Sequence, residues 1–515
     1  MRDGKEETKM KLYNYDEIIE TVRNGIVSIG ISEDELNDKG LSRMFAKIFG
    51  SVLRYSPKRK HWYCYDGRVW REDEGNSTAK SFAKLFSDEL MTYCDNMSLD
   101  DNIIDKISQL ASMSKRNTII RDAECEMTID VENFDRNPML FNCQNGTLDL
   151  IKCTLIPHSA QHMLSKISKA TYDKAAKCER WEQFIDEIME SDQEKTDYLQ
   201  RILGYCLTGD TREEKFYILY GATSRNGKST LIETISYILG GEKGYSASVN
   251  PASLSSARDK NTAKAHGDIA RLAGARMAVT SELPANMTLD TGLLKAMTGG
   301  DSLTVRHLYS SEFEFISQFK LFMNTNHLPT ITDGSVFDSG RANVIEFNRH
   351  FTEQEQDKTL KRKFKKAENM SGILNWLIEG WRKVCIGEDA DGNKVEKGML
   401  PPQSVVDATK RFREDCDKVG CFLSECLEST GGNTKLKDVY EAYQKWTQNN
   451  GFGCEGKVLF KVFLEERHVL SKTGTVEGKT ERNVIKGYTI RSEYLTNNPA
   501  TVTQPPNTPL LHQNV

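Results

Sequence analysis

The sequence predicts a multidomain α/β protein whose central part is a mostly parallel sheet covered by helices. Three observations predict this fold class. The chain has 515 residues, which allows about three or four domains. Between residues 216 and 347, short apolar runs alternate with segments of helical periodicity, and such alternation is typical of parallel sheets. After residue 350 the pattern changes to charged helical segments, so we expect further domains there.

Composition and charge exclude several classes of protein. The formal net charge is −5 and the pI is about 6.1, so any contact with nucleic acid must come from local basic patches. The twelve cysteines contain no CxxC pair, which fits a reducing compartment better than a zinc ribbon or a secreted disulfide framework. The N-terminus lacks an apolar signal region, and no apolar run reaches membrane-spanning length. We therefore expect a soluble, cytoplasmic protein that does not bind a membrane.

The most informative stretch runs from Phe216 to Thr230 and reads FYILYGATSRNGKST. It predicts a short buried strand, a loop over residues 221–227 and a helix that begins at Lys228, which is the required context for the motif GxxxxGK[ST]. The glycines let backbone N–H groups face phosphate oxygens, the lysine reaches the β- and γ-phosphates, and Ser229 can ligate Mg²⁺. The structural alternative is a chance match in a glycine-rich turn. The predicted nucleotide-binding residues are Gly221, Ala222, Thr223, Ser224, Arg225, Asn226, Gly227, Lys228, Ser229 and Thr230.

Strand ends downstream of this loop supply further candidate residues. Residues 276–282, RMAVTSE, predict a strand that ends in Ser281 and Glu282. A buried strand that ends in an acidic residue beside a phosphate loop suits metal and water chemistry. A later apolar strand ends at Asn326, and a turn-rich loop then leads to Arg341 before the last strand of this region.

Between these strands the sequence predicts a helix and a hairpin. Residues 289–297 have helical spacing, with Thr288 or Asp290 near the start and two glycines as the stop. Residues 303–308 and 313–319 predict the two strands of the hairpin.

The N-terminal third carries a basic and aromatic segment. Residues 1 to about 30 are polar and predict a frayed start, and a helix follows around Leu41. Residues 54–73, RYSPKRKHWYCYDGRVWRED, place Asp66-Gly67 between two aromatic runs, which predicts a hairpin. This segment either grips a single nucleic-acid strand or packs its aromatic side chains on the preceding helix, and the second is the more common arrangement.

The C-terminal third predicts helices followed by two strands. Helices are expected at about 405–429, 436–449 and 457–467, and strands at 468–472 and 484–490. Helices followed by a two-stranded wing suggest a winged-helix unit. The tail is rich in Asn, Thr and Pro and predicts disorder.

Together these stretches resemble the superfamily III helicase module of phage and plasmid primase–helicases, which is related to the poxvirus D5-like NTPases. WYCYDGRVW, FNCQNGTLDL and LQRILGYCLTGD are similar to the N-terminal region of that family. GATSRNGKST resembles motif A, RMAVTSEL motif B, LLKAMTGGDSLTVRHLY the B-prime motif, LFMNTNHLP motif C and RANVIEF the arginine-bearing strand. GILNWLIEGW and LPPQSVVDATKRFREDCD resemble the segment that leads into a C-terminal winged helix. The order and spacing of these motifs make the resemblance specific.

The resemblance implies an AAA+-type P-loop NTPase core with a mixed α+β N-terminal domain and a C-terminal winged helix. The implied activity is that of an ATP-dependent DNA helicase that forms a ring, usually a hexamer, in the replication of a phage, plasmid or integrated mobile element. ATP and Mg²⁺ are the implied ligands, with Lys228 on the phosphates and Ser229 and Glu282 at the metal. Glu282 would also polarise the attacking water, and Asn326 would sense the γ-phosphate. Arg341 would reach the ATP of the neighbouring subunit.

The resemblance also implies that the protein binds DNA, both as a single strand and at a fork. The B-prime hairpin of this family projects into the pore of the ring, and the residues implied to contact DNA are Lys295, Arg306 and His307. Too few residues precede Leu41 for the primase domain that relatives often carry, so we expect a separate protein to make primers.

The chain departs from the family pattern at two positions. Ser281 stands where many relatives have a second acidic residue, so direct ligation of Mg²⁺ by a carboxylate at that position is in question. Gly340 stands beside Arg341, where relatives often have two adjacent arginines. Asn324 lies on the same strand as Asn326 and is the alternative phosphate sensor.

The expected domains and the competing functions follow from these assignments. The domains are 1–205 (N-terminal, D5-like type), 206–350 (ATPase core), 351–400 (helical connector), 401–495 (winged helix) and 496–515 (tail). One alternative function is an ATP-switched DNA-binding replication initiator or scaffold without unwinding, which Ser281 favours. Another is a small-molecule phosphotransferase, which would need an acceptor pocket and would have no use for Arg341.

Overall fold

The computed structural model describes residues 15–256, 267–285, 287–306, 312–385, 387–388, 394–395, 398–450 and 453–494. It divides into two compact units, Met1–Thr409 and Lys410–Val515. No helix in the described ranges is both long and apolar enough to cross a membrane. The tail 496–515 and His307 lie outside the described residues.

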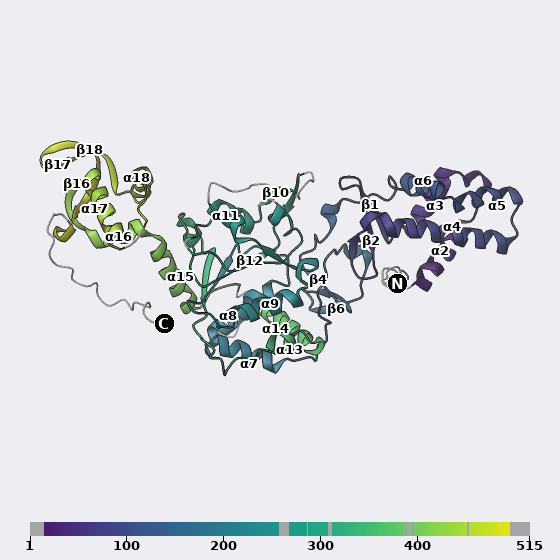
Figure 1. Ribbon diagram of the computed structural model, residues 1–515, viewed down its shortest axis with the longest axis horizontal. Coiled ribbons are helices and arrows are strands. Elements are labelled where there is room, and N and C mark those ends of the chain that lie inside the picture. Colours follow the sequence, from purple (N-terminus) through teal and green to yellow (C-terminus); the bar gives the residue numbers. More distant parts are fainter. Residues whose placement is uncertain are drawn as a thin grey trace. The chain divides into compact units, whose positions relative to one another are not determined.

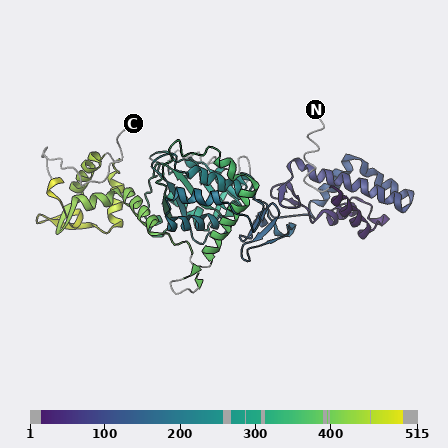
Figure 2. The same cartoon turned by 90° about the horizontal axis from the view of Figure 1, so that it is seen from below.

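The N-terminal segment of the first unit is a helical bundle with a small sheet. Its helices are α2 (Tyr15–Ile29), α3 (Asp38–Phe49), α4 (Ser77–Met97), α5 (Asp101–Ser108) and α6 (Met113–Ala123), coloured purple to blue in Figure 2. The predicted frayed start is wrong for residues 15–29. These residues form a helix because Val22 and Ile26, four residues apart, are fully buried in the core of the bundle.

The basic and aromatic segment forms a three-stranded antiparallel sheet. Its strands are β1 (Leu53–Ser56), β2 (His61–Tyr65) and β3 (Trp70–Glu72), and the predicted turn at Asp66-Gly67 joins β2 to β3. Trp62 is fully buried in the core of the helical bundle, and Tyr63, Tyr65 and Trp70 pack together in a second small cluster. These rings are therefore core residues and are not available to stack on bases, so the packing alternative is the one observed.

A second antiparallel sheet and two helices lead into the centre of the first unit. The sheet consists of β4 (Leu140–Cys143), β5 (Gly146–Asp149) and β6 (Thr154–Ile156). The two-residue turn between β4 and β5 is Gln144-Asn145, and Gly146 is the first residue of β5. Helices α7 (Glu179–Ile188) and α8 (Gln193–Tyr205) follow.

The central sheet has five strands, and all of them are parallel. The strands are β7 (Phe216–Tyr220), β8 (Ser246–Val249), β9 (Met277–Thr280), β12 (Lys320–Thr325) and β13 (Ala342–Glu346), in the order β13–β7–β12–β9–β8. The predicted parallel sheet with alternating helices is confirmed. The strands are mostly buried, which explains why they read as nearly continuous apolar runs.

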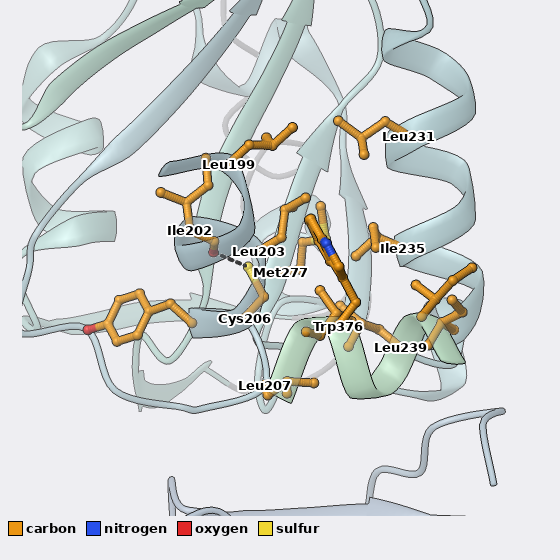
Figure 3. Packing of buried hydrophobic residues seen from close by; sticks show 14 of the residues in the cluster. Leu199, Ile202, Leu203, Cys206, Leu207, Leu231, Ile235, Leu239, Met277 and Trp376 are labelled. Atoms are coloured by element: carbon orange, nitrogen blue, oxygen red, sulfur yellow. Dashed lines mark hydrogen bonds between the residues drawn. The ribbon is translucent and has the colours of Figure 1, made fainter. Parts of the chain in front are cut away.

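Helices cover this sheet on both sides. In Figure 1, α9 (Lys228–Ile238), α13 (Leu360–Phe364) and α14 (Ala367–Cys385) lie on one side of β12, and α11 (Thr291–Thr298) lies on the other. Leu203 from α8, Ile235 from α9, Met277 from β9 and Trp376 from α14 converge in one core cluster (Figure 3). This shared core fixes the position of α9 relative to the strands.

Two buried cations hold the amino-terminal edge of the sheet. Arg276, just before β9, donates to the carbonyl of Leu207, and its guanidinium lies 4.5 Å from the centre of the Tyr245 ring. Lys320, the first residue of β12, donates to the carbonyl of Thr208 at 2.6 Å. Burial lowers the pKa of Lys320 to about 7. These contacts tie the segment that precedes β7 to the neighbouring strands.

Helix α11 is followed by an antiparallel hairpin of β10 (Ser302–Arg306) and β11 (Glu312–Ile316). Of the two candidate start residues, Asp290 caps the helix, because its carboxylate accepts a hydrogen bond from the Leu293 N–H at 3.0 Å. Strand β11 ends three residues earlier than predicted. Ser317 leaves the strand, and its hydroxyl donates to the carbonyl of Met297 at 2.7 Å.

The second unit, taken by itself, combines helices with a three-stranded antiparallel sheet. Its elements are α16 (Lys418–Cys426), β16 (Leu427–Lys435), α17 (Leu436–Asn449), α18 (Lys457–Glu466), β17 (Leu470–Val476) and β18 (Lys479–Ile490), with the sheet order β16–β18–β17.

Two predictions for this region are wrong. The single helix expected over 405–429 is two helices, α15 (Gln403–Cys416) and α16. Asp417 separates them, and its carboxylate caps α16 by accepting from the Gly420 N–H at 2.9 Å. The two-stranded wing has a third strand, β16, whose sequence LESTGGNTK lacks the apolar alternation that would predict it.

Candidate functional site

Three candidate residues lie at the carboxyl-terminal edge of the central sheet. Lys228 is the first residue of α9, Glu282 follows β9 by two residues, and Asn326 immediately follows β12. Strand β12 lies between β7 and β9 and is parallel to both. Since the carboxyl ends of parallel strands meet at one edge, the fold brings these three residues together, at the position where open α/β sheets bind ligands.

The loop 221–227 bends tightly between β7 and α9. Gly227 directly precedes α9 with a φ of +85°, and a β-carbon there would overlap Ile188. A β-carbon at Gly221 would overlap the ammonium group of Lys228. Among the described residues, no side chain caps the start of α9. Its first N–H groups are therefore available to an anion, and the helix dipole favours negative charge there.

The segment after β13 braces this loop. The Phe351 N–H donates to the carbonyl of Arg225 at 2.9 Å, and Nδ1 of His350 lies 2.9 Å from the carbonyl oxygen of Ser224. His350 and Phe351 were not among the predicted site residues. Only the adjacency of β13 to β7 brings them to the loop, and no local motif marks them.

A line of hydrogen bonds joins the three candidate residues. Lys228 Nζ donates to Asn326 Oδ1 at 2.8 Å and to the Gly221 carbonyl at 3.2 Å. Asn326 Nδ2 donates to Glu282 Oε1 at 2.5 Å. By contrast, the side-chain oxygen of Asn324 is buried without a hydrogen-bond partner in the described part of the chain. The geometry therefore favours Asn326 over Asn324 as the residue that responds to a ligand on Lys228.

Lys228 is a buried cation with neutral acceptors. Its exposed fraction is 3%, and burial lowers its pKa to about 8, although the nearby Glu282 opposes this shift. Its two acceptors are a peptide carbonyl and an amide oxygen, so neither supplies a countercharge. An anionic ligand would supply that charge, and a phosphate group suits both Lys228 and the open start of α9.

The candidate metal ligands are Ser229 and Glu282. Ser229 is the second residue of α9, and the side chains of Ser229, Glu282 and Ser281 are exposed. The described residues contain no group of three or more His, Cys, Asp or Glu side chains that would hold a metal by themselves. A hydroxyl and one carboxylate fit Mg²⁺, which keeps several waters and shares its coordination with substrate phosphates.

Arg341 lies at the opposite edge of the sheet. It immediately precedes β13, whose first residue Ala342 is paired with Phe216 at the start of β7. Lys228 lies beyond the other end of β7. The five residues of β7 span roughly 16 Å at about 3.3 Å per residue, and an arginine side chain is too short to cross this span.

The guanidinium of Arg341 is held by three groups of its own subunit. Nη2 forms an ion pair with Glu214, and Nη1 donates to Thr298 Oγ1 at 2.9 Å and to the Lys295 carbonyl at 3.4 Å. Its side chain is 17% exposed. Glu214 and Thr298 were not predicted as partners of Arg341, since both lie far from it along the chain. Glu214 belongs to an ordinary polar stretch, and Thr298 ends a mostly apolar helix.

The three residues implied to contact DNA are placed differently. Lys295 forms an ion pair with Asp333 at 2.6 Å. Although burial opposes the change, hydrogen bonds from Lys295 and Ser335 lower the pKa of Asp333. Arg306, the last residue of β10, is exposed, and His307 lies outside the described residues. The hairpin therefore presents Arg306 to its surroundings, whereas Lys295 is engaged within the subunit.

Two parts of the chain match known sequence families. Residues 42–190 match the sequence family described as D5 N terminal like, and residues 219–341 match a family of unknown function, DUF5906. A protein of Acanthamoeba polyphaga mimivirus named "Putative helicase L207/L206" is 26% identical over 383 residues, which cover 71% of this chain and 39% of the viral protein. "Putative helicase 022R" of Frog virus 3 is 27% identical over 252 residues, which cover 46% of this chain and 25% of that protein. The chain thus spans well under half the length of these curated relatives.

One solved structure that matches this chain is "The apo structure of NrS-1 C terminal region (305-718)". It is 14% identical, the TM-score is 0.47, and the match covers 87% of this chain and 98% of that one. The match of residues 42–190 and the two viral relatives named as putative helicases support a D5-like primase–helicase family.

Proposed function

We propose that this protein is an ATP-dependent DNA helicase of superfamily III with an AAA+-type P-loop core. The observation that carries the proposal is the hydrogen-bonded line Lys228–Asn326–Glu282 beside the uncapped start of α9. It joins a buried cation, a polar sensor and a carboxylate at one ligand-binding edge. The names of the viral relatives support the choice of helicase among the ATPases.

Each residue of the edge has a role in this proposal. The N–H groups of α9 and the loop bind phosphate oxygens, and Lys228 neutralises the β- and γ-phosphates. Mg²⁺ supplies charge neutralisation on those phosphates, with Ser229 as its protein ligand and Glu282 beside it. Glu282 takes the proton of the attacking water. Asn326 links this carboxylate to Lys228, so a change at the phosphates alters the hydrogen bonding of the base.

The proposal extends to the assembly and its DNA partner. Arg341 lies too far from Lys228 of its own subunit, so we propose a ring, most simply a homohexamer, in which each Arg341 serves the next subunit. The hairpin with Arg306 contacts single-stranded DNA at a fork. The second unit is a winged-helix domain in which α18 precedes the hairpin β17–β18. The protein acts in the cytoplasm.

Strand displacement by the purified protein tests the proposal directly. Forked substrates with a 3′ or a 5′ tail should be unwound only with ATP and Mg²⁺, and mass measured in the same buffer should show a ring. ATP binding and DNA binding without any displacement would support an initiator or scaffold instead, the alternative that Ser281 favours. ATP hydrolysis that requires a small-molecule acceptor would point to a phosphotransferase.

The low pKa of Lys228 predicts that nucleotide binding depends on pH. With the site empty the pKa is about 8, and bound phosphates raise it, so the complex holds the proton more tightly. Above pH 8 binding must therefore take up a proton, and affinity falls as pH rises. Between pH 7 and pH 9.5 the affinity for nucleotide should fall about 30-fold if bound phosphates return the pKa of Lys228 to its usual value. Calorimetry in two buffers with different ionisation enthalpies measures the proton uptake, and equal heats at pH 9 would contradict this prediction.

Replacing Arg306 together with His307 by alanine should remove the response to DNA. Neither residue is expected at the phosphates, so turnover without DNA should remain, while DNA-stimulated turnover and unwinding should be lost together. ATPase assays with and without single-stranded DNA measure this. A loss of turnover in the absence of DNA would instead place these residues at the nucleotide.

A further inference from the structure

The contacts of Arg341 connect it to the base of the hairpin in its own subunit. We infer that Glu214 and Thr298 are positioning residues for Arg341 and that Thr298 couples Arg341 to the hairpin β10–β11. The inference rests on the proposed function, in which Arg341 acts on the nucleotide of the next subunit. It assigns roles to Glu214, Thr298 and Asp333, and it gives Lys295 a role other than DNA contact.

Glu214 is held in a conformation that serves this contact. It lies in the turn between α8 and β7 with a φ of +52°, in the left-handed region that residues with a side chain rarely adopt. Its N–H donates to the Thr211 carbonyl at 2.9 Å. The next residue, Lys215, is fixed by a hydrogen bond to the Met399 carbonyl at 2.8 Å. The carboxylate of Glu214 is thus presented to Arg341 by a turn that is fixed on both sides.

Thr298 is the last residue of α11 and connects Arg341 to the hairpin. Its hydroxyl accepts from Arg341 at 2.9 Å and donates to the Leu294 carbonyl at 2.8 Å. Both strands of the hairpin begin or end close to this residue. Ser302, the first residue of β10, lies four residues further along the chain, and Ser317, just after β11, donates to the carbonyl of Met297 at 2.7 Å.

A second contact joins the same helix to the segment that carries Arg341. Lys295, one turn before Thr298, forms the 2.6 Å ion pair with Asp333 in the connection between β12 and β13. This connection continues through α12 (Ser335–Asp338) to Arg341, whose backbone N–H donates to the Val336 carbonyl at 3.0 Å. Helix α11 therefore contacts the β12–β13 connection at two points, and a shift of the hairpin cannot leave the guanidinium of Arg341 undisturbed.

The consequence is a route between DNA and the neighbouring nucleotide. Displacement of the hairpin by DNA moves Thr298, whose hydroxyl accepts a hydrogen bond from Arg341. Conversely, a phosphate of the nucleotide bound to the next subunit attracts Arg341. It therefore competes with Glu214 and Thr298 for the guanidinium. One arginine thus belongs to two alternative sets of partners, and this is the two-state element that coupling between distant sites requires.

Glu214→Ala tests the positioning role by complementation between subunits. It should lower turnover by about 30-fold, less than the loss expected for Arg341→Ala, because the arginine remains but is no longer held. Mixed with Lys228→Ala it should recover activity, since one class of interface then pairs an intact Lys228 with an intact Glu214–Arg341 pair. Mixed with Arg341→Ala it should recover nothing. Glu213→Ala is the matched control, since Glu213 is adjacent but pairs with Lys215, and it should behave as the unmodified protein.

Other outcomes of this experiment contradict the inference. Normal turnover of Glu214→Ala, or recovery with both partners, would overturn the positioning role. Recovery with neither partner would indicate a folding defect, and the mixing experiment is then repeated with the isosteric Glu214→Gln. Failure of this folded variant to recover with Lys228→Ala would also overturn the inference.

Thr298→Val tests the coupling to the hairpin, with Thr298→Ser as its control. Valine keeps the branched shape and removes the hydroxyl, whereas serine keeps the hydroxyl. The ratio of DNA-stimulated to unstimulated turnover should fall about tenfold in the valine variant and stay normal in the serine variant. Equal ratios in the two variants would overturn the coupling.

Hydrogen exchange separates failure of this inference from failure of the proposed function. Backbone amides of residues 291–306 should exchange faster in Glu214→Ala than in Glu213→Ala, whether or not the protein hydrolyses ATP. Absence of turnover in the unmodified protein would refute the proposed function. Unchanged exchange in Glu214→Ala would refute the inference by itself.

Discussion

Arg341→Ala is expected to bind ATP normally and to hydrolyse it roughly 10³- to 10⁵-fold more slowly, the range that arginine fingers contribute elsewhere. The reason is geometric, since Arg341 lies at the edge of the sheet opposite to Lys228 and contributes nothing to ATP binding in its own subunit. Steady-state turnover and nucleotide binding by fluorescence measure the two quantities separately. Arg212→Ala is a suitable control, because Arg212 is a half-exposed arginine near the same edge and pairs with Asp210 at 3.0 Å.

Mixing this variant with Lys228→Ala should restore part of the activity. Each inactive variant still carries the half-site that the other lacks, so interfaces that join an intact Lys228 to an intact Arg341 regain turnover. Subunit exchange must be shown first, for example by resonance energy transfer between labelled subunits. No recovery despite exchange would exclude action in trans.

The second large effect is expected at the carboxyl-terminal edge of the sheet. Lys228→Ala should abolish turnover and weaken ATP binding, because it removes the cation that the loop and α9 present to the phosphates. Glu282→Gln should bind ATP within a few-fold of normal and hydrolyse it roughly 10²- to 10⁴-fold more slowly, since it loses the base and keeps an oxygen that can accept from Asn326. Isothermal calorimetry and a phosphate-release assay distinguish the two variants.

Combining Glu282→Gln with Asn326→Ala tests the hydrogen-bonded line between the residues. If Asn326 connects base and phosphate, Asn326→Ala should lower turnover in the unmodified background far more than in the Glu282→Gln background. Equal effects in both backgrounds would show that Asn326 acts independently of Glu282.

Much of the fold was predictable from the sequence because its signals are local. The loop 221–227 belongs to a contiguous motif whose spacing follows from the geometry of a strand, a loop and a helix, and the parallel strands are apolar runs with polar ends. The meeting of Lys228, Glu282 and Asn326 follows from the parallel arrangement alone. By contrast, β16 and the break at Asp417 could not be predicted, since their sequences carry no periodic apolar pattern and a single capping residue decides where the helix ends.

The partners of Arg341 were beyond prediction for a different reason. Glu214 is separated from it by 127 residues and lies in a polar stretch next to a second glutamate, and Thr298 is separated by 43 residues and ends a mostly apolar helix. Only the pairing of β13 with β7 selects which acidic residue lies beside the arginine. The ion pair of Lys295 could not be predicted for the same reason, because the position of Asp333 depends on how the β12–β13 connection folds back on α11.

The separation of the hydrophobic cores has a thermodynamic consequence. The N-terminal bundle, the central sheet with its helices and the second unit each have their own buried cluster. Heating should therefore produce more than one unfolding transition, and no single melting temperature describes the chain. A ligand raises the melting temperature only of the part whose folded state binds it, so ATP analogues should shift the transition of the central part and leave the others in place. Calorimetric scans with and without nucleotide would thus identify the cooperative unit that binds it without any assay of catalysis.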